Sequence, residues 1–211
     1  MLTPRLRFPI AILLVLAGCR DAAAPLGERN AAGPRFSTTA STAPHILQQS
    51  PTAPRLEAYR VSVWAKRGTQ ASLIVNYRPA PGQSQGDPFL RFRIPPNGLV
   101  AGAGGVPLNR GDSVLITATI DSVSFLVDFQ PSGVLFSKSS PAQVAVWYQD
   151  ANLDLNGDGV VDAADAALLQ QLGIWSTSTT DDWQPLSSKN DRTQQYVISD
   201  VYHFSGYAVA F

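Results

Sequence analysis

The stretch Ser113-Val114-Leu115-Ile116-Thr117-Ala118-Thr119-Ile120 decides the fold class. Its side chains alternate, and most of its residues are β-branched, which is typical of a strand with one buried face. Similar short segments recur between turn sequences at 60–65, 72–77, 89–94, 122–129, 143–148, 195–201 and 207–211. So many short strands within residues 56–211 predict a mainly β fold, an antiparallel β-sandwich with one short helix.

The composition supports a folded chain and excludes some functions. Of 211 residues, 45% are hydrophobic and 15% charged, which is enough apolar material to bury a core. Lys and Arg number 16, as do Asp and Glu, so the basic excess of a nucleic-acid-binding protein is missing and no nucleic acid partner is expected. A single Cys rules out an intrachain disulfide, and with two His it leaves too few ligands for a structural zinc site.

Residues 1–18 are predicted to be a signal peptide, because Arg5 and Arg7 precede an apolar run that is too short for a permanent membrane span. The run ends in Leu16-Ala17-Gly18-Cys19. This sequence resembles the bacterial lipobox, which implies that Cys19 is lipidated and becomes the first residue of the mature protein. We therefore expect a membrane anchor through Cys19 in the bacterial cell envelope, with the protein exposed to the periplasm or the exterior. The alternatives are an ordinary signal peptide or a buried helix with a chance cysteine.

Residues 19–55 are predicted to hold the lipid anchor and a disordered tether. Ala, Pro, Ser and Thr dominate this segment, and its prolines leave no helical or strand period. A flexible chain of about 35 residues has a root-mean-square reach of roughly 30–35 Å. His45 is expected to be a solvated residue of this linker.

The strongest chemical signal is Asp154-Leu155-Asn156-Gly157-Asp158-Gly159-Val160-Val161-Asp162-Ala163-Ala164-Asp165. Oxygen-bearing side chains fall at positions 1, 3, 5, 9 and 12 of this segment, and a glycine stands at position 6 for the sharp turn. This spacing wraps six to eight oxygens around one Ca²⁺ ion. The predicted ligands are Asp154, Asn156, Asp158, the backbone carbonyl of Val160, Asp162 and Asp165.

A helix over 163–172 is expected to follow, with Asp162 as its cap and Gly173 as its stop. Without a cation the carboxylates would repel one another, so the loop is expected to order on binding. The alternative is an Asp, Asn and Gly turn that holds no metal.

The motif resembles the EF-hand loop, and its continuation over 165–172 resembles a dockerin repeat, in which the loop leads into one exit helix without an entering helix. Dockerins carry two repeats and this chain shows one, so the cohesin partner that a paired repeat implies is not expected. The loop and helix form a predicted insertion in the sandwich at about 150–174.

A second resemblance is carried by residues 131–148, 183–186 and 201–209. They resemble the sandwich domain shared by zonula occludens proteins, ankyrins and netrin receptors, over roughly residues 90–211. Some members of that family cut their own chain between Phe and Ser of a His-Phe-Ser triplet. Here Ser205 is the candidate nucleophile on the Phe204 carbonyl and His203 the candidate base. The favoured interpretation is structural, with Phe204 in the core and His203 capping a carbonyl.

Together these features predict a calcium-binding cell-envelope lipoprotein, a non-enzymatic surface binding or structural module with an unidentified protein or glycan partner. One alternative is a self-processing domain that cleaves at Phe204–Ser205. The other is a carbohydrate-binding accessory protein, for which the candidate platform residues are Trp64, Trp147, Trp175 and Trp183.

Overall fold

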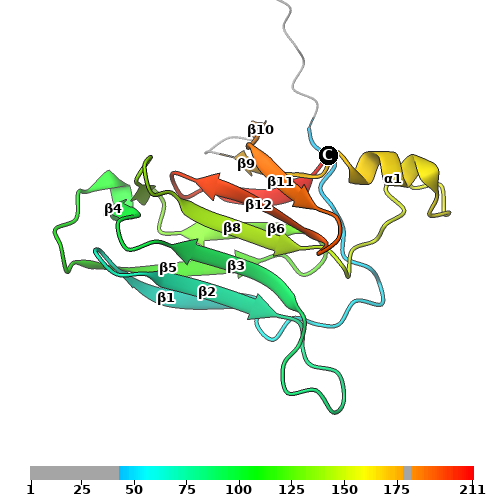
Figure 1. Ribbon diagram of the computed structural model, residues 1–211, viewed down its shortest axis with the longest axis horizontal. Coiled ribbons are helices and arrows are strands. Elements are labelled where there is room, and N and C mark those ends of the chain that lie inside the picture. The colour runs from blue at the N-terminus through cyan, green and yellow to red at the C-terminus, as the bar shows by residue number, and fades with distance from the viewer. Residues whose placement is uncertain (1–42, 178–181) are drawn as a thin grey trace, which may run out of the picture. The chain divides into compact units, whose positions relative to one another are not determined.

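Two antiparallel sheets face each other in the computed structural model, which describes residues 43–177 and 182–211 (Figure 1). The six-stranded sheet contains, in spatial order, β1 (Arg60–Lys66), β5 (Ser113–Ile120), β6 (Leu126–Gln130), β13 (Gly206–Ala210), β9 (Gly173–Thr177) and β10 (Trp183–Pro185). The five-stranded sheet contains β11 (Ser188–Asp191), β12 (Tyr196–Val201), β8 (Ala142–Trp147), β3 (Pro88–Ile94) and β2 (Ala71–Asn76). The predicted mainly β fold with one short helix is confirmed.

Smaller elements complete the described part of the chain. A two-stranded sheet pairs β4 (Leu99–Ala101) with β7 (Leu135–Phe136). A short 3₁₀ turn, η1, covers Ala103–Gly105, and the helix α1 covers Ala163–Leu169. None of the described helices is long and apolar enough to cross a bilayer.

The alternation in β5 determines which side chains enter the core. Val114, Ile116, Ala118 and Ile120 are buried between the sheets, whereas the residues between them lie on the outer face of the six-stranded sheet. The hydroxyl of Thr117 on that outer face lies 2.8 Å from the hydroxyl of Ser62 in the neighbouring strand β1. The period of two thus places the apolar face inward, as expected for a sheet with one solvated face.

An aromatic cluster within the core joins the two sheets. Phe204 lies between Phe129 and Phe136, at ring-centroid distances of 5.2 and 5.1 Å. Phe92, on the five-stranded sheet, contacts the same ring at 5.5 Å. Residues from both sheets therefore meet around one side chain, which itself precedes the last strand.

The predicted tether is wrong for residues 43–55, which pack against the sandwich. Leu47 is 1% exposed and belongs to the core. Its N–H donates to the Val209 carbonyl at 2.9 Å, and its carbonyl accepts from the N–H of Phe125. His45 is exposed, as expected, but it is held in place because its ring stacks on Phe211 at 5.5 Å. The prolines of this segment exclude a helix but not an extended segment that pairs with its neighbours. Composition alone therefore wrongly predicted a disordered tether here.

The predicted signal peptide at 1–18, the lipidation residue Cys19 and the predicted tether up to residue 42 lie outside the described residues. Among the described residues, the folded part already includes His45, which pairs with Phe211. The start at residue 56 that the sequence predicted is too late.

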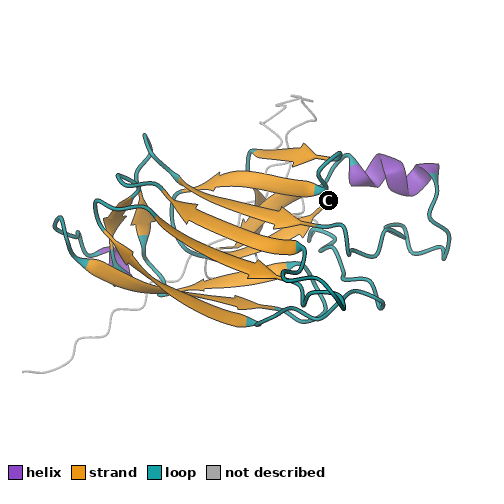
Figure 2. Ribbon diagram, turned by 60° about the horizontal axis from the view of Figure 1, so that its bottom comes forward, coloured by secondary structure: helices purple, strands orange, loops and turns teal. Residues whose placement is uncertain are grey.

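The strands give the sandwich two distinct ends, seen in Figures 1 and 2. Strands β1 and β3 run toward the end that carries β4, which we call the turn end. Strands β8 and β13 run antiparallel to their partners β3 and β6 and finish at the opposite end, where α1 projects. We call this the helix end. The described chain both begins and finishes there, because Ile46 pairs with Ala210.

Candidate metal centre

The predicted calcium loop lies at the helix end, in the connection between β8 and β9. Buried side chains fix the connection on its β8 side, because Tyr148 is fully buried and Ala151 forms an isolated bridge with Gln49. The segment from Asp154 to Asp165 then extends away from the sheets and leads into α1 (Figure 2). The loop and α1 therefore form the connection between Trp147, the last residue of β8, and Gly173, the first of β9.

The first half of the loop is a tight turn in which side-chain oxygens accept backbone N–H groups. Asp154 Oδ2 accepts from the N–H of Gly159 at 2.9 Å. Asn156 Oδ1 accepts from the N–H of Asp158, and Asp158 Oδ1 accepts from the N–H of Val160, both at 2.9 Å. Gly159 has φ +88°, a backbone conformation that favours glycine. Three of the predicted ligands therefore stabilise the turn by hydrogen bonds to its backbone.

Asp165 joins the second half of the loop to the first. Its side chain is 2% exposed. Oδ1 accepts from the N–H groups of Leu155 and Asn156 at 2.7 and 3.1 Å, and Oδ2 accepts from the N–H of Asp162 at 2.8 Å. The hydrogen bond from Asp162, supported by those from Asn156 and Leu155, lowers the pKa of the Asp165 carboxyl against the opposing effect of burial. The group is therefore held as a carboxylate.

Asp162 begins the helix, as predicted, by accepting from the N–H of Ala164 at 2.7 Å in a capping box with Asp165. The helix ends earlier than predicted, at Leu169. Gly173 does not stop the helix but begins β9. The Asn190 side chain instead donates to the Leu169 carbonyl at 2.8 Å, which satisfies a group at the end of the helix.

One buried side-chain oxygen of this loop has no hydrogen-bond partner among the described residues. Asp154 Oδ1 is buried and accepts no hydrogen bond, although the other oxygen of the same carboxylate does. Burial of a carboxylate oxygen without a hydrogen-bond donor costs free energy of folding. A bound cation would satisfy such an oxygen in place of a donor. This orphaned atom fits the calcium ligand that the sequence assigns to position 1.

The loop carboxylates are not gathered around a common point. Within residues 43–177 and 182–211, no three or more His, Cys, Asp or Glu side chains form a group that could hold a metal ion. Asp158 Oδ1, Asp162 Oδ1 and both oxygens of Asp165 accept from backbone N–H groups, and Asp158 Oδ2 accepts from the side-chain amide of Asn156. Binding of a metal would require these side chains to move toward one point, and each oxygen retains a second lone pair with which it could bind the ion.

Sequence reasoning missed Asn152, which lies just before the loop. Its Oδ1 accepts from the N–H of Asp154 at 3.1 Å and so orients the first predicted ligand. An Asn two residues before an Asp is the signal that could have identified it, because such side chains bond to the backbone two residues on.

The triplet His203-Phe204-Ser205, just before β13, has the geometry of a core anchor. Phe204 is 6% exposed, and its N–H donates to the Val134 carbonyl at 3.1 Å. The Ser205 hydroxyl donates forward to the Gly206 carbonyl at 3.3 Å. The His203 ring nitrogen Nδ1 lies 3.4 Å from the Phe204 carbonyl oxygen. His203 thus contacts the carbonyl and not the hydroxyl whose proton it would need to accept.

The four tryptophans do not form one platform. Trp64, Trp175 and Trp183 belong to the six-stranded sheet, whereas Trp147 belongs to the five-stranded sheet. Trp147 packs against Tyr196 at 5.3 Å and carries the Arg91 guanidinium 5.4 Å from its ring centroid.

Comparison of the chain with known proteins finds no matching family model, no matching curated protein and no matching solved structure. The resemblances to the lipobox, to dockerin and EF-hand loops and to the zonula occludens sandwich domain therefore stay predictions.

Proposed function

We propose that this chain is a calcium-binding lipoprotein of the bacterial cell envelope, whose sandwich serves as a non-enzymatic binding or structural module. The observation that carries the proposal is the buried, unpartnered Oδ1 of Asp154 at the first position of a loop with calcium-ligand spacing. Asp154, Asn156, Asp158 and Asp165 would hold the ion with the Val160 carbonyl, and Asp162 would act directly or through water.

Calcium in this site would stabilise the inserted loop. The ion would neutralise the carboxylates that otherwise repel one another and would connect the turn at Asp154 to the start of α1 at Asp165. Such a role is structural, and a site of 10⁻⁴–10⁻³ M affinity would remain filled where calcium is millimolar.

The test is calorimetric titration of residues 20–211 with calcium, followed in parallel by thermal melting. We expect one site whose occupancy raises Tm, and we expect Asp154→Asn to abolish both effects. The matched control is Asp200→Asn, which changes an exposed carboxylate on β12 that accepts from Gln143 and should leave calcium binding as in the parent chain. Absence of binding at millimolar calcium in the parent chain refutes the metal site.

The lipid anchor is tested separately. The lipobox resemblance at Cys19 supports it, and Cys19→Ser should move the protein from the membrane fraction to the soluble fraction of the producing bacterium. Intact-mass measurement should show the added acyl chains on the parent protein. A parent protein that lacks lipid and fractionates as soluble refutes the anchor and leaves the calcium proposal unaffected.

A further inference from the structure

A cavity of about 430 Å³ opens at the turn end, opposite the calcium loop. Three connections meet there: the β1–β2 turn, the β3–β4 turn and the loop that precedes β5. Its lining consists of Arg67, Gly68, Pro96, Asn97, Leu99, Asn109 and Arg110. The volume falls within the range of small-molecule sites.

Two arginines from distant parts of the sequence converge on this cavity. The Arg67 guanidinium donates through Nη1 to the carbonyl of Leu108. The Arg110 side chain lies against the backbone of Gly68, where a Cβ added to the glycine would be 3.5 Å from Arg110 Cγ. Gly68 has φ +92°, so the turn itself favours glycine and leaves room for the second arginine.

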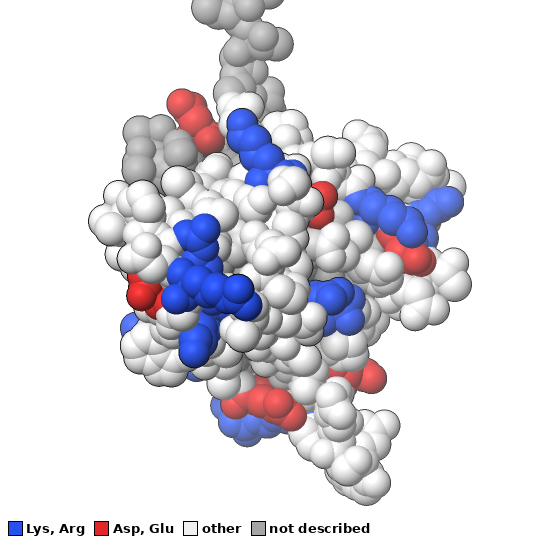
Figure 3. All heavy atoms as spheres, turned by 60° about the vertical axis from the view of Figure 1, so that its left-hand side comes forward, with Lys and Arg blue, Asp and Glu red and all other residues white. Residues whose placement is uncertain are grey.

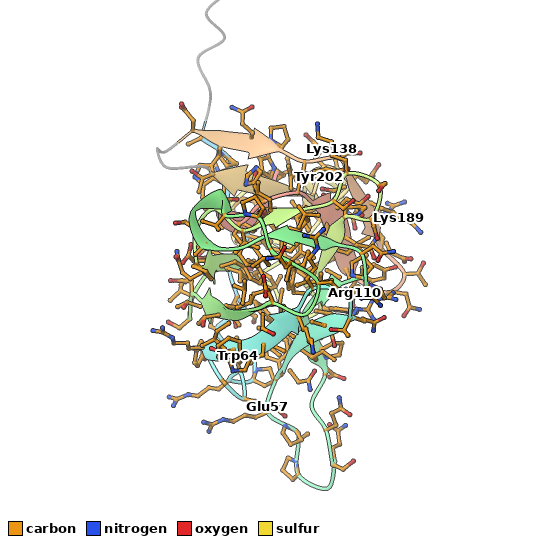
Figure 4. The ribbon with its side chains drawn as sticks, turned by 90° about the vertical axis from the view of Figure 1, so that its left-hand side faces the viewer. Glu57, Trp64, Arg110, Lys138, Lys189 and Tyr202 are labelled. Atoms are coloured by element: carbon orange, nitrogen blue, oxygen red, sulfur yellow. The ribbon has the colours of Figure 1, made fainter. Side chains whose placement is uncertain are left out.

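The charge of these arginines is not neutralised locally. No Asp or Glu lines the cavity, and within the described residues neither guanidinium is paired with a carboxylate. The carboxylate of Asp112, in the same loop, is directed to the Asn109 N–H at 2.7 Å. Figure 3 brings this end toward the viewer and shows Lys and Arg side chains gathered on the surface, and Figure 4 places Arg110 on the same end.

We propose that this cavity binds a sugar that carries a phosphate or sulfate ester. The guanidinium groups of Arg67 and Arg110 retain planar forks of N–H donors that match tetrahedral oxyanions. The amides of Asn97 and Asn109 supply donors and acceptors for hydroxyl groups beside the ester. A cavity of this size accommodates a sugar in addition to the anion.

The test titrates the chain in the presence of a calcium chelator, so that it is independent of the calcium proposal. The probes are glucose 6-phosphate, glucose 6-sulfate, dextran sulfate and the neutral sugars glucose and dextran, with binding followed by calorimetry. We expect the esters to bind and the neutral sugars not to bind, with affinity falling as salt is raised. Tighter binding of dextran sulfate than of the monosaccharide esters assigns the site to a surface polysaccharide, and the reverse order assigns it to a free sugar ester.

Arg110→Gln should weaken ester binding about tenfold or more, since it removes charge-assisted hydrogen bonds. The matched control is Arg78→Gln, an exposed arginine after β2 at the helix end, which should bind like the parent chain. Arg67→Lys, which retains the charge but removes the fork, should also weaken binding. Because Arg110 is exposed, an unchanged Tm is expected to accompany the loss. Failure of every ester to bind, or equal binding by the Arg110 and Arg78 variants, overturns the proposal.

Discussion

Substitution of Phe204 by Ala should be among the most destabilising single changes in the sandwich. The ring is 6% exposed and contacts Phe92, Phe129 and Phe136, so truncation removes contacts to both sheets at once. Loss of a buried Phe side chain costs about 3–5 kcal/mol, because transfer and cavity contributions add. For a domain of this size that loss corresponds to a fall in Tm of roughly 6–20 °C.

The assay is urea unfolding followed by fluorescence and circular dichroism, and we expect a lower midpoint with an unchanged m-value. The control is Tyr202→Ala two residues away, where the side chain is 45% exposed and the loss should be under about 1 kcal/mol. A loss below about 1.5 kcal/mol for the Phe204 variant would mean that the two sheets do not meet at this ring.

Three further changes test other parts of the fold. Leu47→Ala should cost about 2–5 kcal/mol in urea unfolding, since the residue is fully buried, and an effect no larger than that of Gln48→Ala would restore the tether interpretation. Asp165→Asn in a chelator should lower Tm at pH 7. Because the pKa of Asp165 is lowered in the folded state, its contribution to stability is complete above its ordinary pKa of 3.8 and declines as the pH falls further. The Tm values of the variant and the parent chain should therefore converge in acid. A Tm difference that stays constant with pH contradicts this mechanism. Gly86→Ala should cost about 1–3 kcal/mol, because a Cβ would lie 1.7 Å from the Tyr77 carbonyl oxygen, and an unchanged Tm would show that this backbone contact is absent.

Strands with a clear period of two could be predicted from the sequence, and strands that depend on their neighbours could not. The stretch 113–120 coincides with β5 because its alternation matches one buried face. Strand β11 has the polar sequence Ser188–Asp191 and pairs with β12 only in the folded chain. Strand β10 contains Pro185, which is acceptable because this strand lies at the edge of its sheet.

The expected strand at 122–129 shows how a side chain can override a pattern. Asp121 Oδ1 accepts from the N–H groups of Val123 and Ser124 at 2.8 and 2.7 Å, and these bonds hold the backbone in a turn. The same hydrogen bonds lower the pKa of the Asp121 carboxyl. The strand therefore begins only at Leu126 and continues to Gln130.

In the candidate metal centre, sequence spacing located the loop and the helix start but not the hydrogen bonds that hold them together. Position 12 predicted a ligand, a role that stays a prediction, whereas in the structure Asp165 accepts from three backbone N–H groups earlier in the loop. Such bonds depend on the path of the backbone in three dimensions, which spacing does not encode. The arginine cavity was missed for a similar reason, since Arg67 and Arg110 are brought together only by the strand order.

The pairing of the first described residues with the end of β13 determines how the domain would respond to a pulling force. His45 and Phe211 exchange backbone hydrogen bonds, and Leu47 bonds to Val209, in an antiparallel arrangement. A force that pulls residue 43 outward, away from the body of the sandwich, acts along the strand axis and therefore perpendicular to these hydrogen bonds. The bonds would then be loaded together in shear and not opened one at a time. A domain held by its N-terminal segment would therefore resist forced unfolding at the point where that segment pairs with β13.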